Sequence, residues 1–121
     1  MHDIFFYKDR SGVEPVKEYM RELDRKKDKD SRIKLNKIRD YVKILSEYGK
    51  AAGEPYVKPI DGEIWELRPL RDRILFVAWY NNSFVLLHHF LKTTKKTPQR
   101  EIDKAKREYQ DLLERGLNNG K

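Results

Sequence analysis

Apolar residues near the amino terminus indicate a short strand followed by a helix. Residues 3–7 form a run of aromatic and branched side chains, which is typical of a strand. Ser11 and Glu14 have the spacing of a capping box, and Pro15 suits the first turn of a helix. The apolar positions that follow have a helical period: Val16, Tyr19, Met20 and Leu23. We therefore expect a first helix of about 15 residues.

A second helical stripe follows a charge-dense connector at residues 24–30. Asp30 or Ser31 can cap this helix, because both side chains accept hydrogen bonds from backbone N–H groups. Its apolar positions are Ile38, Tyr41, Val42 and Leu45. Gly49 is a natural stop, so we expect a helix of about 18 residues that forms an antiparallel hairpin with the first.

The apolar period changes from helical to strand-like in the second half of the chain. Residues 49–62 contain three glycines and two prolines, and they predict a loop with at most a short extended piece at residues 56–58. Residues 64–68, 73–80 and 84–92 alternate or are almost wholly apolar, as strands are. Because these strands follow one another along the chain, we expect a three-stranded antiparallel meander.

Turn signals flank the last predicted strand. Asn81-Asn82 suits a tight hairpin, because asparagine tolerates positive φ. Thr97-Pro98 supplies an N-cap followed by a first-turn proline, and the apolar spacing over residues 102–112 predicts a third helix. Residues 117–121 are expected to form a flexible tail.

Composition fits one domain over residues 1–121, with 38% hydrophobic and 39% charged residues in 121. The element order predicts an α+β fold of two layers: an N-terminal strand, a helical hairpin, an antiparallel meander and a C-terminal helix. No apolar stretch approaches the roughly 18 residues of a membrane span, no secretory signal is visible, and there is no cysteine. We therefore expect a cytoplasmic protein without membrane association or disulfides.

Positive charge is concentrated in one third of the chain. Residues 68–107 carry ten lysines and arginines against three acids, so this segment has the same net charge as the whole protein, +7. A segment of one sign creates a field that concentrates polyanions, which makes nucleic acid the leading candidate partner. A basic face that serves only solubility is the alternative.

Three basic residues lie at the ends of the predicted strands. Arg68 closes the first strand of the meander, Arg73 opens the second and Lys92 closes the third. Antiparallel pairing would bring these ends to one edge of the sheet. Strand ends are exposed and often basic, so a chance gathering is the competing interpretation.

The histidines do not indicate a metal site. His88 and His89 are adjacent in a strand and must point to opposite sides, and alternation places His88 on the face of Leu86 and Lys92. Neighbouring strand positions cannot readily chelate one metal, and no third ligand stands at a recognised spacing, so we expect no metal. Either histidine can be hydrogen-bonded in or near the core, or can serve in acid–base chemistry.

A basic cleft without metal or cysteine can still cut RNA. The ribose 2′-OH is an internal nucleophile, so an enzyme needs only to align it, move protons and stabilise charge on the phosphorane. Arginine matches phosphate oxygens bidentately, and a lysine beside other cations can exchange protons near neutrality. The P-loop, GxSxG and GxGxxG signatures are absent, and no cofactor is expected.

Several motifs together resemble one family of toxins. They are Tyr56-Val57-Lys58-Pro59-Ile60-Asp61-Gly62, Ile64-Trp65-Glu66-Leu67-Arg68, Arg73-Ile74-Leu75-Phe76 and the run from Phe84 to Pro98. With the helical pair and the closing helix, they resemble the phage-derived HigB-like toxins of the RelE superfamily. The resemblance implies a RelE-like fold and a type II toxin–antitoxin toxin, a ribosome-associated endoribonuclease that cleaves mRNA and inhibits translation. It also implies a HigA-type helix-turn-helix antitoxin as partner.

The resemblance also assigns residues. Arg68 matches the arginine of the family's Glu-Leu-Arg motif, Arg73 the arginine before the aromatic-rich strand, and Lys92 the lysine after a Phe-x motif. His88 falls on another family-favoured position and completes the set of catalytic candidates. The neighbouring basic residues are expected to bind RNA: Arg71, Lys95, Lys96 and Arg100.

Two other functions fit the same features. A non-catalytic nucleic-acid-binding module would use the same basic sheet and C-terminal helix, and an interaction protein would dock its basic face on an acidic partner. An enzyme requires strict dependence of cleavage on one or two basic residues. For a binding module we expect substitutions at several of these basic residues to weaken binding by similar amounts, with no cleavage.

Overall fold

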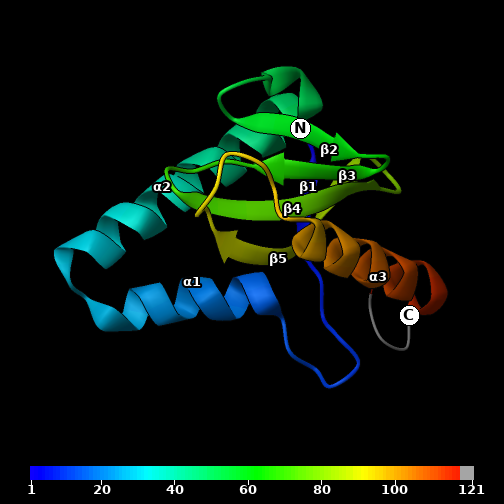
Figure 1. The fold of residues 1–121 in the computed structure, drawn as a ribbon, viewed down its shortest axis with the longest axis horizontal. Coiled ribbons are helices and arrows are strands. Elements are labelled where there is room, and N and C mark those ends of the chain that lie inside the picture. Colours follow the sequence, from blue (N-terminus) through cyan, green and yellow to red (C-terminus); the bar gives the residue numbers. More distant parts are fainter. Residues whose placement is uncertain (118–121) are drawn as a thin grey trace.

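The computed structural model describes residues 1–117, and within them five strands form one mixed sheet in the order β1-β5-β4-β3-β2 (Figure 1). The elements in chain order are β1 (Asp3–Phe6), α1 (Pro15–Lys26), α2 (Lys29–Tyr48), the 3-10 helix η1 (Gly49–Ala52), β2 (Val57–Asp61), β3 (Ile64–Leu67), β4 (Asp72–Trp79), β5 (Ser83–Leu91) and α3 (Gln99–Arg115). The predicted α+β class and the helical hairpin are confirmed.

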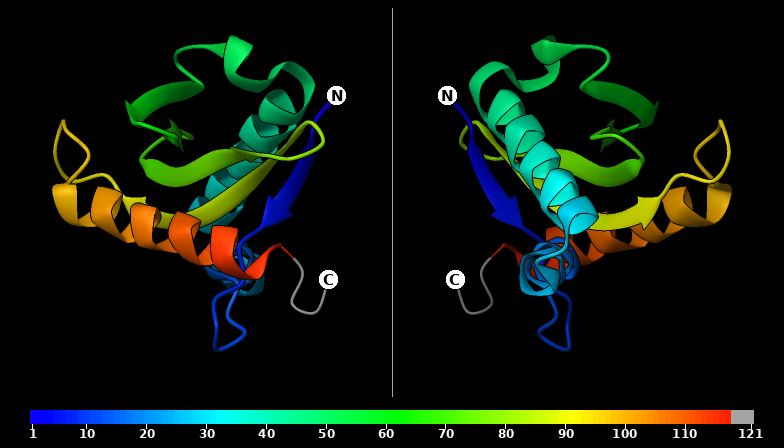
Figure 2. Two further views of the ribbon diagram at one scale, coloured as in Figure 1. Left: turned by 90° about the vertical axis from the view of Figure 1, so that its right-hand side faces the viewer. Right: turned by 90° about the vertical axis from the view of Figure 1, so that its left-hand side faces the viewer.

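Helices cover both faces of the sheet. Phe76 packs with Ile38 of the α1–α2 hairpin in one core cluster, whereas its neighbour Val77 packs with Leu112 of α3 in a second cluster. The two views of Figure 2 show α3 in front of the sheet from one side and α2 in front of it from the other. The expected two layers are therefore wrong, because β4 and β5 are apolar on both faces and need cover on each.

The sheet has one more antiparallel strand than the sequence predicted. β2 pairs with β3, with Val57 opposite Leu67 and Pro59 opposite Trp65, so the meander has four strands. Pro59 is tolerated because β2 lies at the edge of the sheet, where a missing N–H need not leave a gap in the ladder. At the opposite edge β1 runs parallel to β5.

A β-bulge in β5 changes which side chains share a face. Leu75 lies opposite His88, but the next residue of β4, Phe76, lies opposite Leu86, so Leu87 is an extra residue in the ladder. Leu86 therefore packs with the helical hairpin, whereas Leu87 packs in the cluster with α3. The expectation that Leu86 and His88 share one face is wrong, because simple alternation fails across a bulge.

The start of α2 is capped by Asp28 rather than by Asp30 or Ser31. The backbone N–H of Ser31 donates to Asp28 Oδ1 at 2.7 Å, and the Ser31 hydroxyl donates to Oδ2 at 2.9 Å. These hydrogen bonds hold the pKa of the Asp28 carboxyl below its ordinary value.

The other two predicted caps are also used differently. Ser11 donates its hydroxyl to Asp9 at 2.7 Å within the loop before α1, and that helix has no side-chain cap. The Thr97 hydroxyl donates to Glu66 of β3 at 2.7 Å, and Pro98 occupies the N-cap position of α3. In both places a partner outside the helix competes successfully for the hydroxyl.

The tight hairpin between β4 and β5 is confirmed, with Asn81 and Asn82 both at φ 58°. The prediction of a flexible tail falls mainly on residues 118–121, which lie outside the described residues. No helix within residues 1–117 is long and apolar enough to cross a membrane.

The packing predicts a large loss of stability at Phe76, whose side chain is fully buried between the sheet and the hairpin. Phe76→Ala should lower the free energy of unfolding by about 3–5 kcal/mol, because it removes apolar contacts and leaves a cavity. Urea unfolding measures the change. Ile33→Ala, on a side chain that is 44% exposed, should change it by no more than about 0.5 kcal/mol. Equal losses in the two variants would contradict this packing.

Candidate functional site

The antiparallel order of β3, β4 and β5 brings three predicted site residues to one end of the sheet. Arg68 directly follows β3, Arg73 is the second residue of β4, and Lys92 directly follows β5. One backbone hydrogen bond and one side-chain hydrogen bond join the last two strands at this end: Lys92 N–H donates to the Arg71 carbonyl at 2.8 Å, and the Arg71 side chain donates through Nη2 to the Lys92 carbonyl at 3.2 Å. We call Glu66, Arg68, Arg73 and Lys92 the strand-end cluster.

A buried carboxylate lies at the centre of the strand-end cluster. Glu66 is 2% exposed, and its Oε1 lies 3.5 Å from Arg68 Nε and 3.8 Å from Arg73 Nε. Its other oxygen accepts the hydrogen bond from Thr97. Glu66 therefore pairs with two basic side chains at once. A buried carboxylate needs such partners, because an unpaired charge is very unfavourable away from water.

Arg73 is held firmly and is almost hidden from solvent, with 6% of its surface exposed. Its Nη1 donates to the carbonyls of Leu70 and Asp72, each at 2.8 Å. Burial, followed by the nearby charge of Arg68, lowers the pKa of Arg73 below that of an ordinary arginine. Because the two carbonyls hold Nη1, the guanidinium of Arg73 has a fixed direction.

Arg68 is more accessible, with 20% of its side chain exposed. Its Nη1 lies 3.8 Å from the exposed carboxylate of Glu54, a weak contact in water. Its Nε is buried and makes no hydrogen bond within the described residues. Of the two arginines, Arg68 has more capacity left to bind an anion.

The loop after β5 closes over the cluster and leaves only a crevice of about 10 Å³. Its lining includes Glu66, Arg73 and Lys92, together with residues 93–98 of the loop. A volume of this size holds about one water molecule. The crevice is therefore too small for a phosphate group, and the lysines lie at its rim, where Lys95 and Lys96 are exposed and Lys92 is half-buried.

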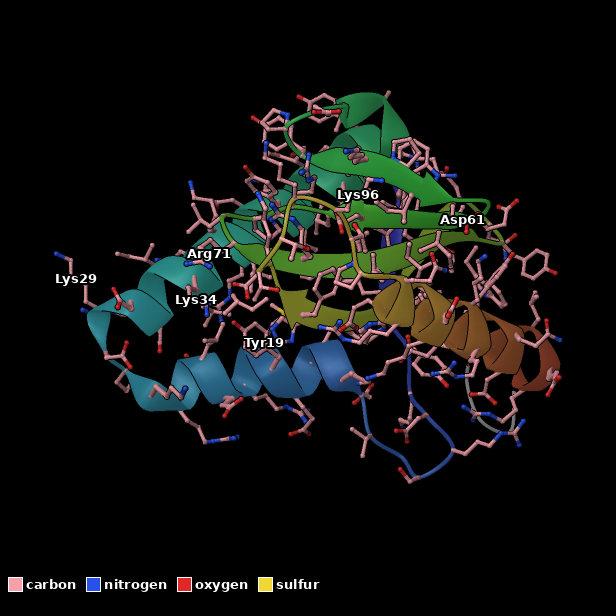
Figure 3. The ribbon with its side chains drawn as sticks, viewed as in Figure 1. Tyr19, Lys29, Lys34, Asp61, Arg71 and Lys96 are labelled. Carbon is pink, nitrogen blue, oxygen red and sulfur yellow. The ribbon has the colours of Figure 1, made fainter. Side chains whose placement is uncertain are left out.

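The remaining predicted RNA-binding residues lie around this rim or beyond it. Arg71 is exposed on the turn before β4, and Figure 3 labels it together with Lys96. Arg100 is exposed on the first turn of α3 and lies 3.7 Å from Glu101, which partly neutralises it.

His88 is not part of the strand-end cluster. It is 1% exposed, and its two ring nitrogens face carboxylates of α3: Nδ1 lies 2.6 Å from Glu108 and Nε2 lies 2.9 Å from Glu101. Both nitrogens can donate at once only when the imidazole is protonated. The side chain ties β5 to α3, in agreement with the interpretation of a hydrogen-bonded core histidine.

A second polar cluster, which sequence reasoning missed, lies on the other face of the same sheet end. Asp72 is 1% exposed and is contacted by Tyr19, Lys34 and His89. One signal was available: Asp72 is an acid at the start of a strand that is otherwise apolar except for Arg73. Its partners come from two helices and β5, so no local pattern could name them.

The described residues contain no group of three or more histidines, cysteines, aspartates or glutamates placed to hold a metal ion. The strand-end cluster holds two guanidinium groups around a buried carboxylate, and such cations can bind an anion such as phosphate and stabilise its charge.

Comparison with known families identifies the chain. Residues 18–110 match the family described as phage derived protein Gp49-like (DUF891), a span from α1 into α3 that includes the whole strand-end cluster. Comparison with curated proteins finds no match. Because the family match covers far more than half of the chain, this protein belongs to the phage-derived Gp49-like family, which is related to the RelE-type toxins of toxin–antitoxin systems.

Proposed function

We propose that this chain is the toxin of a type II toxin–antitoxin system and acts as a metal-independent endoribonuclease on mRNA at the ribosome, in the manner of HigB. The observation that carries the proposal is the strand-end cluster: two arginines lie beside one buried carboxylate, backbone carbonyls hold one of them, and lysines line the adjoining rim. Preorganised cations of this kind stabilise charge that develops on a phosphate in the transition state. Membership of a toxin-related family supports the same conclusion.

The proposed reaction uses the RNA's own 2′-oxygen as nucleophile. This oxygen attacks the adjacent phosphorus and the bond to the 5′-oxygen breaks, which yields a 2′,3′-cyclic phosphate and a 5′-hydroxyl. The 2′-proton passes to solvent water and the 5′-oxygen gains a proton from an acid, so proton transfer must accompany attack. Arg68 is suited to bind the phosphate oxygens, and the ammonium of Lys92 beside the crevice is suited to protonate the leaving oxygen.

A non-catalytic nucleic-acid-binding module is the second candidate. The observation that favours it is the small crevice, which leaves most of the cationic surface on an open rim. Diffuse contacts of lysine and arginine with phosphates give binding without chemistry. Substitution of single residues separates the two functions.

Arg68→Ala should lower the rate of mRNA cleavage on translating ribosomes by about 10²-fold, because loss of one preorganised donor costs about 3 kcal/mol of transition-state stabilisation. Primer extension on mRNA from a translation extract measures the rate. The matched control is Lys8→Ala, which removes one exposed cation from the loop after β1 and should leave the rate unchanged. Similar small losses in both variants, with folding intact by circular dichroism, would favour the binding module.

The ends of the RNA fragments test the nucleophile. Attack by the 2′-oxygen predicts 2′,3′-cyclic phosphate or its 3′-phosphate hydrolysis product, and mass spectrometry of the fragments distinguishes these ends. EDTA should not prevent cleavage once the ribosome's own need for magnesium has been met. Fragments with 3′-hydroxyl ends would mean that water is the nucleophile, and the proposed mechanism would be wrong.

The proposed partner is a HigA-type antitoxin with a helix-turn-helix domain. An RNase that acts on cellular mRNA needs a separate inhibitor, and the basic segment predicts that the inhibitor carries acids at the interface. Induced expression of this chain should stop bacterial growth, and co-expression of the neighbouring open reading frame should restore it. The association rate of the purified pair should fall as salt rises. A chain that is harmless at high expression would contradict the proposed toxin.

A further inference from the structure

Asp72 is a buried carboxylate that the proposed chemistry does not use. It is 1% exposed and lies on the hairpin side of the sheet end. The Tyr19 hydroxyl of α1 donates to its Oδ1 at 2.8 Å. Lys34 Nζ of α2 lies 3.9 Å from the same oxygen, and His89 Nε2 of β5 lies 3.5 Å from it. One carboxylate therefore joins both helices of the hairpin to β4 and β5.

The partners of Asp72 also pack against one another. The rings of Tyr19 and His89 are stacked with centroids 3.5 Å apart at an interplanar angle of 12°, and Lys34 Nζ lies 5.6 Å from the Tyr19 ring. Figure 3 labels Tyr19 on α1 and Lys34 on α2, with Arg71 at the neighbouring sheet end. Burial and the adjacent carboxylate raise the pKa of Tyr19, so its hydroxyl remains a donor even in alkaline solution.

The backbone of Asp72 belongs to the turn that directs Arg73. Asp72 N–H donates to the Pro69 carbonyl at 3.0 Å and closes this turn, in which Leu70 has a φ of 56°. The carbonyls of Asp72 and Leu70 then accept the two hydrogen bonds from Arg73 Nη1. Because the side chain of Asp72 is fixed from the hairpin side, the carbonyls that hold the guanidinium are fixed as well.

We propose that Tyr19 and Asp72 are positioning residues for Arg73, through which the helical hairpin sets the geometry of the strand-end cluster. The proposal rests on the proposed RNase function for its effect on rate. Removal of the Tyr19 hydroxyl leaves a buried carboxylate short of a donor, and the turn then relaxes. A small displacement of a catalytic group lowers the rate strongly even when substrate still binds.

The chain contains a matched control for this interaction. Tyr7 is 5% exposed and donates its hydroxyl to Asp111 of α3 at 2.5 Å, so it forms a second pair of tyrosine and carboxylate, in which the carboxylate is partly buried. Asp111 lies toward the C-terminal end of α3, whereas the strand-end cluster meets the loop before the N-terminal end. Tyr7→Phe therefore removes the same chemical contact without touching the turn around Asp72.

The first test compares Tyr19→Phe with Tyr7→Phe, with thermal unfolding to record the loss of stability in each. Tyr19→Phe should lower the cleavage kcat about 10-fold with KM within about twofold, and Tyr7→Phe should leave both within about twofold. In an Arg73→Ala background, Tyr19→Phe should have no further effect on kcat, because it acts through Arg73. Equal effects of the two tyrosine variants, or an additive effect in the Arg73→Ala background, would overturn the proposal.

A second readout does not depend on RNase activity. The NMR signal of the Arg73 Nε–H group should shift in Tyr19→Phe and stay in place in Tyr7→Phe, because only the first change alters the turn that holds the guanidinium. If the wild-type chain does not cleave mRNA, the proposed function fails but this signal still decides the positioning role. An unchanged Arg73 signal in Tyr19→Phe would show that the hairpin does not set its geometry.

Discussion

The antiparallel pairing of β4 with β5 is the interaction on which the rest of the structure depends. These are the two longest strands, and each is buried along most of its length between the helical hairpin and α3. Their register places Arg73 opposite Phe90 and so brings the start of β4 to the end of β5. The same register, with its bulge at Leu87, decides which side chains face the hairpin and which face α3.

Two buried carboxylates stabilise the same end of the sheet from opposite faces. Glu66 is surrounded by Arg68, Arg73 and Thr97 on the side of α3, and Asp72 by partners from α1, α2 and β5 on the other side. Each charge is compensated locally, as buried ions must be. Part of the positive charge in the basic segment therefore serves the fold, and the lysines on the rim remain available to an anionic partner.

The geometry of this sheet end limits how the proposed RNase can work. The crevice above Glu66 is too small for a nucleotide, and Arg73 is oriented by backbone carbonyls rather than by solvent. The proposed mechanism therefore places the RNA across the rim, beside Arg68 and the lysines of the loop after β5. His88 contributes differently: by bridging Glu101 and Glu108 it anchors α3 beside that loop.

The sequence by itself determined the class of the fold, the helical hairpin, the Asn81-Asn82 turn and the approach of Arg68, Arg73 and Lys92, because each follows from a local period or a short connection. Only the tertiary structure decided the cover on both sheet faces, the strand β2, the bulge that turns His88 of β5 toward α3, and the partners of Glu66 and Asp72. These features join residues far apart in the chain, such as Tyr19 and Asp72. Local propensity carries no information about such pairs, since they form only when strands and helices have packed.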